Sequence, residues 1–250
     1  MDVFDPAVAF GPAVVVWLAA AIAFAGGSIV LRGRVDSDAS YDPNRAWSIA
    51  LSYFAVCWAL AAATNVAGTL TTRSPFGVGG LDETRFVLWG LACVAVEIIA
   101  YGVIWPMGTL THGRPRRIGW QLGFGLLWGI SEAQLFLSIW DVSERFVPGS
   151  RWIGGLVAFT LISAFTGIWH DKFWDIHVAP EHNIIEWNAR KVFCCHIPNL
   201  VITLTFLAVY RAPGLFVIFQ TVSLMLSVWF MRFPAPDDTA AAVQAPAATA

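Results

Sequence analysis

Long apolar stretches, separated by short polar segments, run through almost the whole chain. An α-helix of about 20 apolar residues crosses the roughly 30 Å hydrocarbon core of a bilayer. The first stretch follows Asp2 and Asp5 rather than a basic segment, so we interpret it as a span and not as a cleaved signal peptide. The pattern predicts an all-α fold, a polytopic membrane helix bundle of about seven transmembrane helices, over residues 11–31, 47–68, 86–108, 119–140, 152–170, 191–210 and 213–232.

The composition supports a membrane protein with a single helical domain. Hydrophobic residues make up 57% of the chain and charged residues 13%, which lies outside the usual range of soluble domains. We expect one transmembrane domain over residues 1–234 and a disordered Ala/Pro-rich tail over 235–250. The lipid bilayer is then the main partner, and a net charge of −2 gives no electrostatic basis for binding nucleic acid.

Basic residues are distributed unevenly between alternate loops, which predicts the orientation of the chain. Cytoplasmic loops of membrane proteins carry an excess of Lys and Arg. The side with more of them would be cytoplasmic, so we expect the N-terminus outside and the C-terminus in the cytoplasm. That side holds Arg32, Arg34, Arg45, Arg114, Arg116, Arg117, Lys172, Arg190, Lys191 and Arg232, against Arg73, Arg85, Arg145, Arg151 and Arg211 on the other.

Two carboxylates, Glu97 and Glu132, lie deep within apolar spans. An acidic residue at the centre of a transmembrane helix costs roughly 2.5–3.5 kcal/mol, so such residues usually face a bundle interior or a water-filled cavity. Their helices are neighbours in sequence, and the two side chains are candidates to share a proton, to bind one metal ion or to carry protons in catalysis. In the alternative interpretation both are neutral and hydrogen-bonded by Asn65, Gln121 or Gln134.

Four of the five histidines fall in one polar segment, WHDKFWDIHVAPEHNIIEWNARKVFCCHIPN, which starts at Trp169. Proline favours the first turn of a helix, so we expect a new helix from about Pro180 into the sixth span. Side chains four residues apart share one face of a helix and can bind one ion together. The candidate metal ligands are His170, His182, Glu186, His177 and His196. Two further acids, Asp171 and Asp175, would orient the imidazoles.

The type of metal is not fixed by these side chains. Imidazole and carboxylate together suit zinc, copper, iron or nickel. In the alternative interpretation the segment is a solvated cytoplasmic loop, and Glu186 with Arg190 forms an ordinary surface ion pair.

The segment WHDKFWDIHVAPEH resembles a stretch of the membrane C subunit of copper-dependent methane and ammonia monooxygenases. A second segment, GLDETRFVLW followed by VAVEIIAYGVIW, is similar to that subunit's loop and helix around an intramembrane Glu, which corresponds to Glu97. The resemblance implies copper bound by His170 and His182, and partner subunits in a larger complex. The residues that match the family are His170, Phe173, Trp174, Ala179, Pro180 and His182. The interval between the two histidines is shorter here than in the family.

Three functions follow from these observations as hypotheses. The first is an integral membrane metal-binding protein, an oxidoreductase of monooxygenase type or a subunit of one, with its site at the cytoplasmic ends of spans five and six. The second is a membrane carrier coupled to a proton or a cation through Glu97 and Glu132. The third is a non-catalytic assembly subunit. We expect a bacterial cytoplasmic membrane as the location, with other membrane subunits or a homo-oligomer as partners and an unidentified small-molecule substrate.

Several cofactor classes are excluded by the residues themselves. The last span contains no lysine, because the chain's lysines are Lys172 and Lys191, so a retinal Schiff base in the seventh helix is excluded. The sequence has no flavin or nicotinamide fingerprint and no CxxCH for covalent haem. Non-covalent haem held by two histidines stays open.

Overall fold

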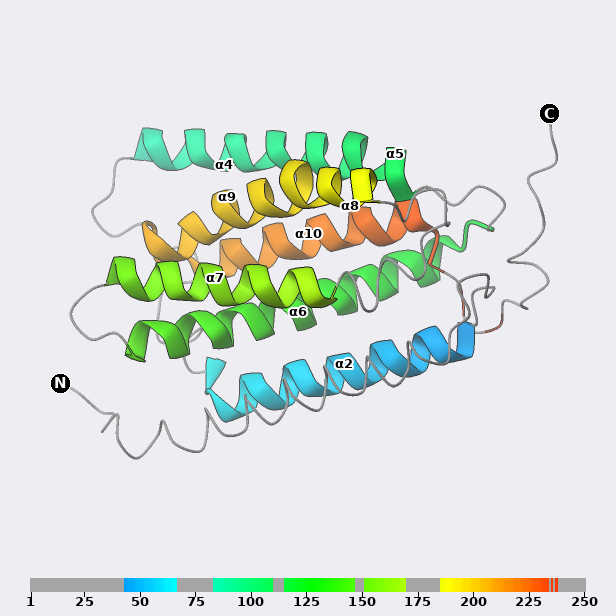
Figure 1. The fold of residues 1–250 in the computed structure, drawn as a ribbon, viewed down its shortest axis with the longest axis horizontal. Helices are drawn as coiled ribbons and strands as arrows, with labels where there is room; N and C mark the ends of the chain where they lie inside the picture. Colours follow the sequence, from blue (N-terminus) through cyan, green and yellow to red (C-terminus); the bar gives the residue numbers. More distant parts are fainter. Residues whose placement is uncertain are drawn as a thin grey trace.

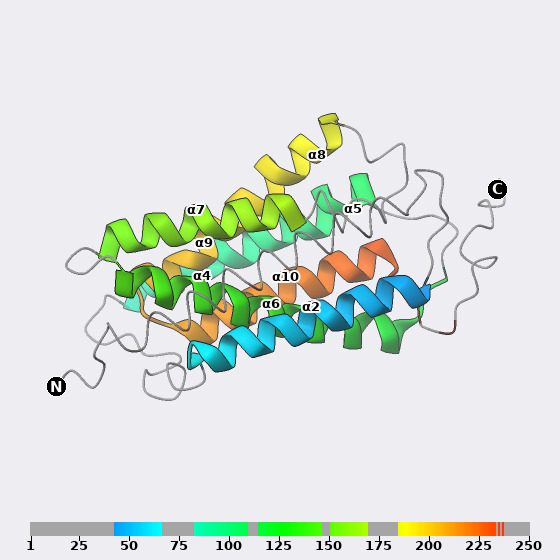
Figure 2. The same ribbon diagram turned by 60° about the horizontal axis from the view of Figure 1, so that its bottom comes forward.

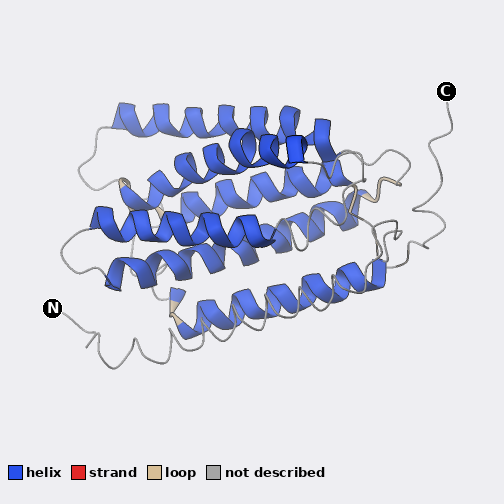
Figure 3. Cartoon of the chain, viewed as in Figure 1, coloured by secondary structure: helices blue, strands red, loops and turns tan. Residues whose placement is uncertain are grey.

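The structure is a computed structural model that describes residues 43–66, 83–109, 115–146, 151–169, 185–233, 235 and 237. Within these ranges the regular structure is entirely helical (Figure 3). Two of the helical segments, labelled η, have π-helical hydrogen bonding. In chain order the elements are α2 (Pro43–Ala63), α4 (Glu83–Glu97), η1 (Ile98–Ile104), α5 (Trp105–Thr109), α6 (Ile118–Phe146), α7 (Arg151–Trp169), α8 (Ile185–Lys191), η5 (Val192–His196), α9 (Ile197–Ala208) and α10 (Pro213–Met231).

Four of the described helical stretches are long and apolar enough to cross a membrane, which indicates an integral membrane protein. Apolar side chains on α4 and η1, such as Leu88, Leu91 and Ile98, are exposed, as expected for a surface that faces lipid. The all-α prediction is confirmed for the described residues, and four predicted spans coincide with the stretches Thr84–Met107, Ile118–Glu144, Ile185–Ala208 and Pro213–Met231.

The other predicted spans are shorter in the structure or fall outside it. α2 and α7 contain apolar stretches of Ala50–Ala63 and Trp152–Gly167, which are shorter than the four above. The predicted span at 11–31 and nearly all of the predicted tail at 235–250 lie outside the described residues.

Helix α6 is central to the packing of the bundle. It packs most extensively on α10, and also on α2 and α7, while α4 packs on α9. The helices run roughly alongside one another, with α2 and α4 on opposite sides of the molecule (Figure 1). In the turned view the helices again run alongside one another, and α8 extends away from the body of the bundle (Figure 2). Helices α4 and α6, although close in sequence, are therefore not main packing partners of each other.

Two glycines allow α6 and α10 to approach each other closely. A Cβ atom on Gly125 would lie 2.8 Å from the Cα of Met225, and one on Gly129 would lie 2.5 Å from the Cα of Thr221. Both distances are too short for any side chain, so the contact requires glycine at these positions. The four-residue spacing is the small-xxx-small pattern by which membrane helices pack backbone against backbone. The contact also brings Gln220 of α10 beside α6.

The two π-helical segments lie next to each other and share a sequence feature. η1 and η5 are in contact, and each ends two residues before a proline, Pro106 and Pro198 respectively. Proline has no N–H for the helical hydrogen bond to the residue four before it, so the preceding turn is free to widen. The predicted sixth span is thus interrupted before Pro198 by a π segment.

Candidate functional site

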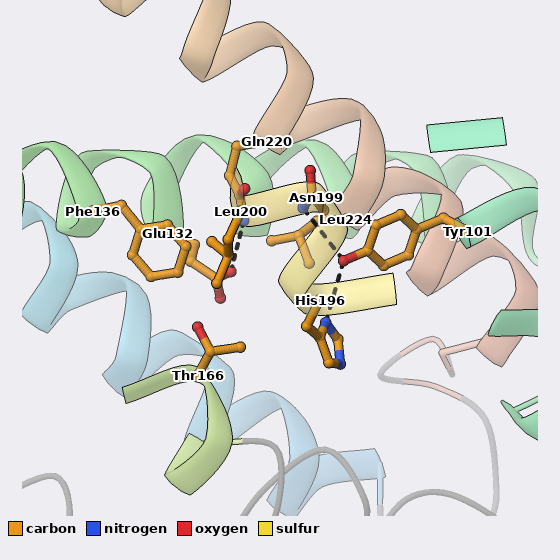
Figure 4. Close-up of a pocket in the computed structure, with 9 residues that line it drawn as sticks. All are labelled: Tyr101, Glu132, Phe136, Thr166, His196, Asn199, Leu200, Gln220 and Leu224. Carbon is orange, nitrogen blue, oxygen red and sulfur yellow. Dashed lines mark hydrogen bonds between the residues drawn. The ribbon is translucent and has the colours of Figure 1, made fainter. Parts of the chain in front are cut away.

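A small cavity lies where α6, α7, α9 and α10 meet the two π segments, and it has room for about one water molecule. Figure 4 shows its polar side chains converging from different helices. Membrane helices have no water with which to satisfy buried polar groups, so such a gathering calls for internal partners or a ligand. The lining residues are Tyr101, Glu132, Phe136, Thr166, His196, Asn199, Leu200, Gln220 and Leu224.

Glu132 is held on one side of the cavity by three hydrogen-bond donors. The Tyr53 hydroxyl and the Trp128 indole N–H donate to Oε2, each at 3.0 Å, and the Gln220 amide donates to Oε1 at 2.9 Å. Hydrogen bonds to a charged group contribute about 1.5–3 kcal/mol each, which offsets part of the cost of removing a carboxylate from water. The carboxyl of Glu132 is therefore fixed in position by α2, α6 and α10 together.

A second polar cluster, centred on His196, lies on the other side of the cavity. The Tyr101 hydroxyl is 3.2 Å from Nδ1 of His196, and the Asn199 amide donates to the same hydroxyl at 3.3 Å. Because the phenol oxygen accepts from Asn199, its own proton is available to Nδ1. The ring of His196 also packs edge-on against Trp105, with centroids 5.2 Å apart.

The two polar clusters are connected through α10. The Asn199 amide reaches Oγ of Ser223 at 3.5 Å, and that hydroxyl donates to the backbone carbonyl of Gln220 at 2.9 Å. Gln220 in turn donates to Glu132. Gln220 therefore contacts both clusters, with its backbone carbonyl on the Ser223 side and its side-chain amide on the Glu132 side.

The π segments place the residues of the second cluster. Tyr101 belongs to η1 and His196 to η5. The thiol of Cys195 donates to the backbone carbonyl of Ala100 at 3.2 Å, which ties the two segments together next to the cavity. π bulges occur frequently at functional sites because they turn side chains that a regular helix would point elsewhere.

Glu97 does not line the cavity, although it is buried. Neither of its carboxyl oxygens has a hydrogen-bond partner among the described residues. α4 packs on α9 rather than on α6, so the structure does not bring Glu97 and Glu132 together as one site. The partners suggested from sequence are wrong for Glu132, because its donors are Tyr53, Trp128 and Gln220.

The candidate metal ligands divide into those that the structure describes and those that it does not. His196 is buried beside the cavity. Glu186 lies in the first turn of α8 and is exposed. Within the described ranges no three His, Cys, Asp or Glu side chains gather closely enough to hold a metal ion. The remaining candidates lie outside the described residues: His170, His177, His182, Asp171 and Asp175.

Lys191 differs from its expected position. The orientation of the chain in the membrane is predicted from loop residues that include Lys191. In the structure Lys191 is buried, and its ammonium lies 5.9 Å from the centre of the Trp105 ring. Its location at the end of α8 brings a positive charge toward the second polar cluster.

Sequence reasoning identified Glu132 and His196 but missed most of their neighbours. Asn199 and Gln220 are isolated polar residues within apolar spans, and this was the signal that could have identified them. Tyr53, Trp128 and Tyr101 carry no such signal, because aromatic residues are common throughout the spans.

Comparison with protein-family models, with curated proteins and with solved structures finds no match to this chain. The resemblance to the monooxygenase subunit therefore stays a prediction.

Proposed function

We propose that the chain is an integral membrane carrier coupled to a proton or a small cation, with the cavity beside Glu132 as its transport site. One observation carries the proposal: a carboxyl, an imidazole and a phenol line the same small cavity inside the bundle. Ionisable residues within membrane spans generally mark ion pathways and proton relays.

The polar groups around Glu132 and His196 supply the chemistry that this function needs. Glu132 accepts a proton at its carboxylate when the cavity opens to one side, and releases it when the cavity opens to the other. The hydroxyls of Tyr101 and Ser223 both donate and accept hydrogen bonds, so they can reorient as a proton moves. The π segments supply helix geometry that differs from the regular α-helix beside the cavity, where a change of access would have to occur.

Proton flux across a membrane tests this function. The purified protein is reconstituted into liposomes that contain a pH-sensitive dye, and a K⁺ diffusion potential is imposed with valinomycin. We expect the lumen to acidify faster than in protein-free liposomes, with and without an added Na⁺ gradient. Flux equal to that of protein-free liposomes under both conditions would exclude coupling to protons, and the further absence of Na⁺ or K⁺ uptake into the same liposomes would exclude the proposal.

A metal-dependent oxidoreductase, or a subunit of one, is a second candidate function. Thr166 and His196 both line the cavity, and they belong to α7 and to the helical stretch Ile185–Ala208, between which residues 170–184 lie in the sequence. That segment contains His170, His177 and His182. Glu186 and His196 do not form a metal site by themselves among the described residues, so this candidate depends on ligands from the segment, with copper favoured by the family resemblance.

Metal analysis of the purified protein tests the second candidate. We expect about one copper, iron or zinc ion per chain, lost in His170→Ala and His182→Ala. Arg116→Ala is the control, because Arg116 is an exposed basic residue just before α6, far in sequence from residues 170–184, and it is not a metal ligand. Metal content that is negligible, or equal in all four proteins, would contradict it.

We also propose that the full chain crosses the membrane seven times, with the N-terminus outside and the C-terminus in the cytoplasm. The excess of basic residues in alternate loops supports this orientation.

A further inference from the structure

The two carboxyl oxygens of Glu132 accept different numbers of hydrogen bonds. Oε2 accepts from the Tyr53 hydroxyl and from the Trp128 indole, each at 3.0 Å. Oε1 accepts only from the Gln220 amide among the described residues, at 2.9 Å (Figure 4). A carboxylate offers about four lone-pair positions, two on each oxygen. The donors therefore leave one position open, and it is on Oε1.

This arrangement of donors favours a proton over a metal ion. Oxygen-bound metal ions need several ligands, about six for Mg²⁺ and more for Ca²⁺. Glu132 has one open lone-pair position, and the hydrogens of its three donors carry partial positive charge that opposes a cation. A proton needs a single acceptor position. The cavity has room for about one water molecule, which is enough to bring a proton to the carboxyl.

Gln220 is the partner of Glu132 that best adapts to a proton. An oxygen that gains a proton becomes a donor and needs an acceptor, and the Trp128 indole can only donate. A proton on Oε2 would therefore face the indole N–H, whereas one on Oε1 faces Gln220. The glutamine amide carries an acceptor and a donor at one end, and turning it over exchanges the two in place. Oε1 of Gln220 has no hydrogen-bond partner among the described residues, so the turn breaks only the bond to Glu132.

We propose that the ion taken up at this site is a proton, which bonds to Oε1 of Glu132, and that the Gln220 amide turns over with it. In the ionised state Nε2 of Gln220 donates to the carboxylate, as the structure shows. A hydrated proton in the cavity then transfers H⁺ to Oε1 of Glu132, which forms an O–H bond and leaves a water molecule. The new hydroxyl donates to Oε1 of Gln220 in place of the former N–H bond, and release of the proton reverses these steps.

Gln220 is thus a positioning residue, because the proton itself is carried by Glu132. The inference rests on the proposed carrier function, and it names the ion that the carrier accepts.

Infrared spectroscopy of the purified full chain in lipid follows the amide directly. Wild type is prepared with and without ¹³C in the side-chain amide of glutamine, and spectra at high and low pH are subtracted. We expect a glutamine C=O band to move to lower wavenumber as Glu132 gains its proton, because the amide oxygen then accepts a hydrogen bond. The isotope shifts this band and so assigns it to glutamine without any substitution. A glutamine that only fills space would give no such band.

Two variants identify which glutamine responds. Gln220→Met keeps the length of the side chain but removes the amide, so we expect the glutamine band to disappear. The C=O band of protonated Glu132 should then move to higher wavenumber, because its hydroxyl has lost its acceptor. Gln134→Met is the matched control, because Gln134 is also buried but does not line the cavity. It should retain both bands of wild type.

The outcomes separate this inference from the proposed function. A Glu132 carboxyl band that changes with pH while no glutamine band changes overturns the inference, and so does a glutamine band that persists in Gln220→Met. Uptake of Na⁺ into liposomes without proton flux also overturns it but leaves the carrier function in place. A pH-dependent Gln220 band in a protein that carries no ion supports the inference and overturns the carrier.

Discussion

Gly129→Leu is expected to prevent α6 and α10 from packing, and so to remove most of the folded protein. Even a single Cβ at this position would lie 2.5 Å from the Cα of Thr221, which is backbone and cannot rotate away. Overpacking a core costs about 1–3 kcal/mol for added methylenes, and a leucine against a backbone exceeds that range. The measurement is the yield and Tm of monodisperse protein after extraction in detergent.

Gly123→Leu is the matched control for this substitution. Gly123 lies on the same helix, is exposed, and has no atom within 4 Å of its built Cβ. A leucine there faces outward, and we expect yield and Tm close to those of wild type. Equal behaviour of the two variants would show that the close contact of α6 with α10 does not hold the bundle together.

Glu132→Gln is expected to lower the proton flux of the reconstituted protein to less than about a tenth of the wild-type rate, as for loss of a group that transfers protons. The substitution removes the ionisable group from the cavity. It retains a carbonyl oxygen that can accept from Tyr53 and Trp128, so the fold should persist. The dye-loaded liposome assay measures the rate, and the Tm of the same preparation reports folding.

Glu186→Gln provides the control for the flux measurement. Glu186 is an exposed carboxylate on α8 that does not line the cavity, so the carrier function predicts unchanged flux. Wild-type flux in a well-folded Glu132→Gln protein would show that protons do not pass through this site.

The helical fold could be predicted from the sequence because apolar length alone specifies a membrane helix. The predicted spans at 86–108 and 213–232 agree closely with Thr84–Met107 and Pro213–Met231. The packing of these helices could not be predicted in the same way. A helix that is apolar on all sides does not reveal which face meets a neighbour, since lipid and protein interior are equally apolar.

For the candidate site too, individual residues could be predicted from the sequence, but their assembly by helix packing could not. Glu132 and His196 were candidates because ionisable residues are rare in apolar spans. Their placement in one cavity depends on α6, α10 and η5 meeting there, and η5 follows from the effect of Pro198 on hydrogen bonding rather than from any apolar pattern. A site shared by Glu97 and Glu132 stays a prediction, and the two helices, although close in sequence, have different main packing partners.

The most direct test of the account is the infrared carboxyl absorption of the protein in lipid, recorded as the pH of the surrounding buffer is changed. If Glu132 exchanges protons with water through the cavity, wild type shows a carboxyl component that is absent in Glu132→Gln. Glu97→Gln should retain that component, because Glu97 does not line the cavity. A component that persists unchanged in Glu132→Gln would contradict the account, because it would show that the cavity carboxyl does not take part in proton exchange.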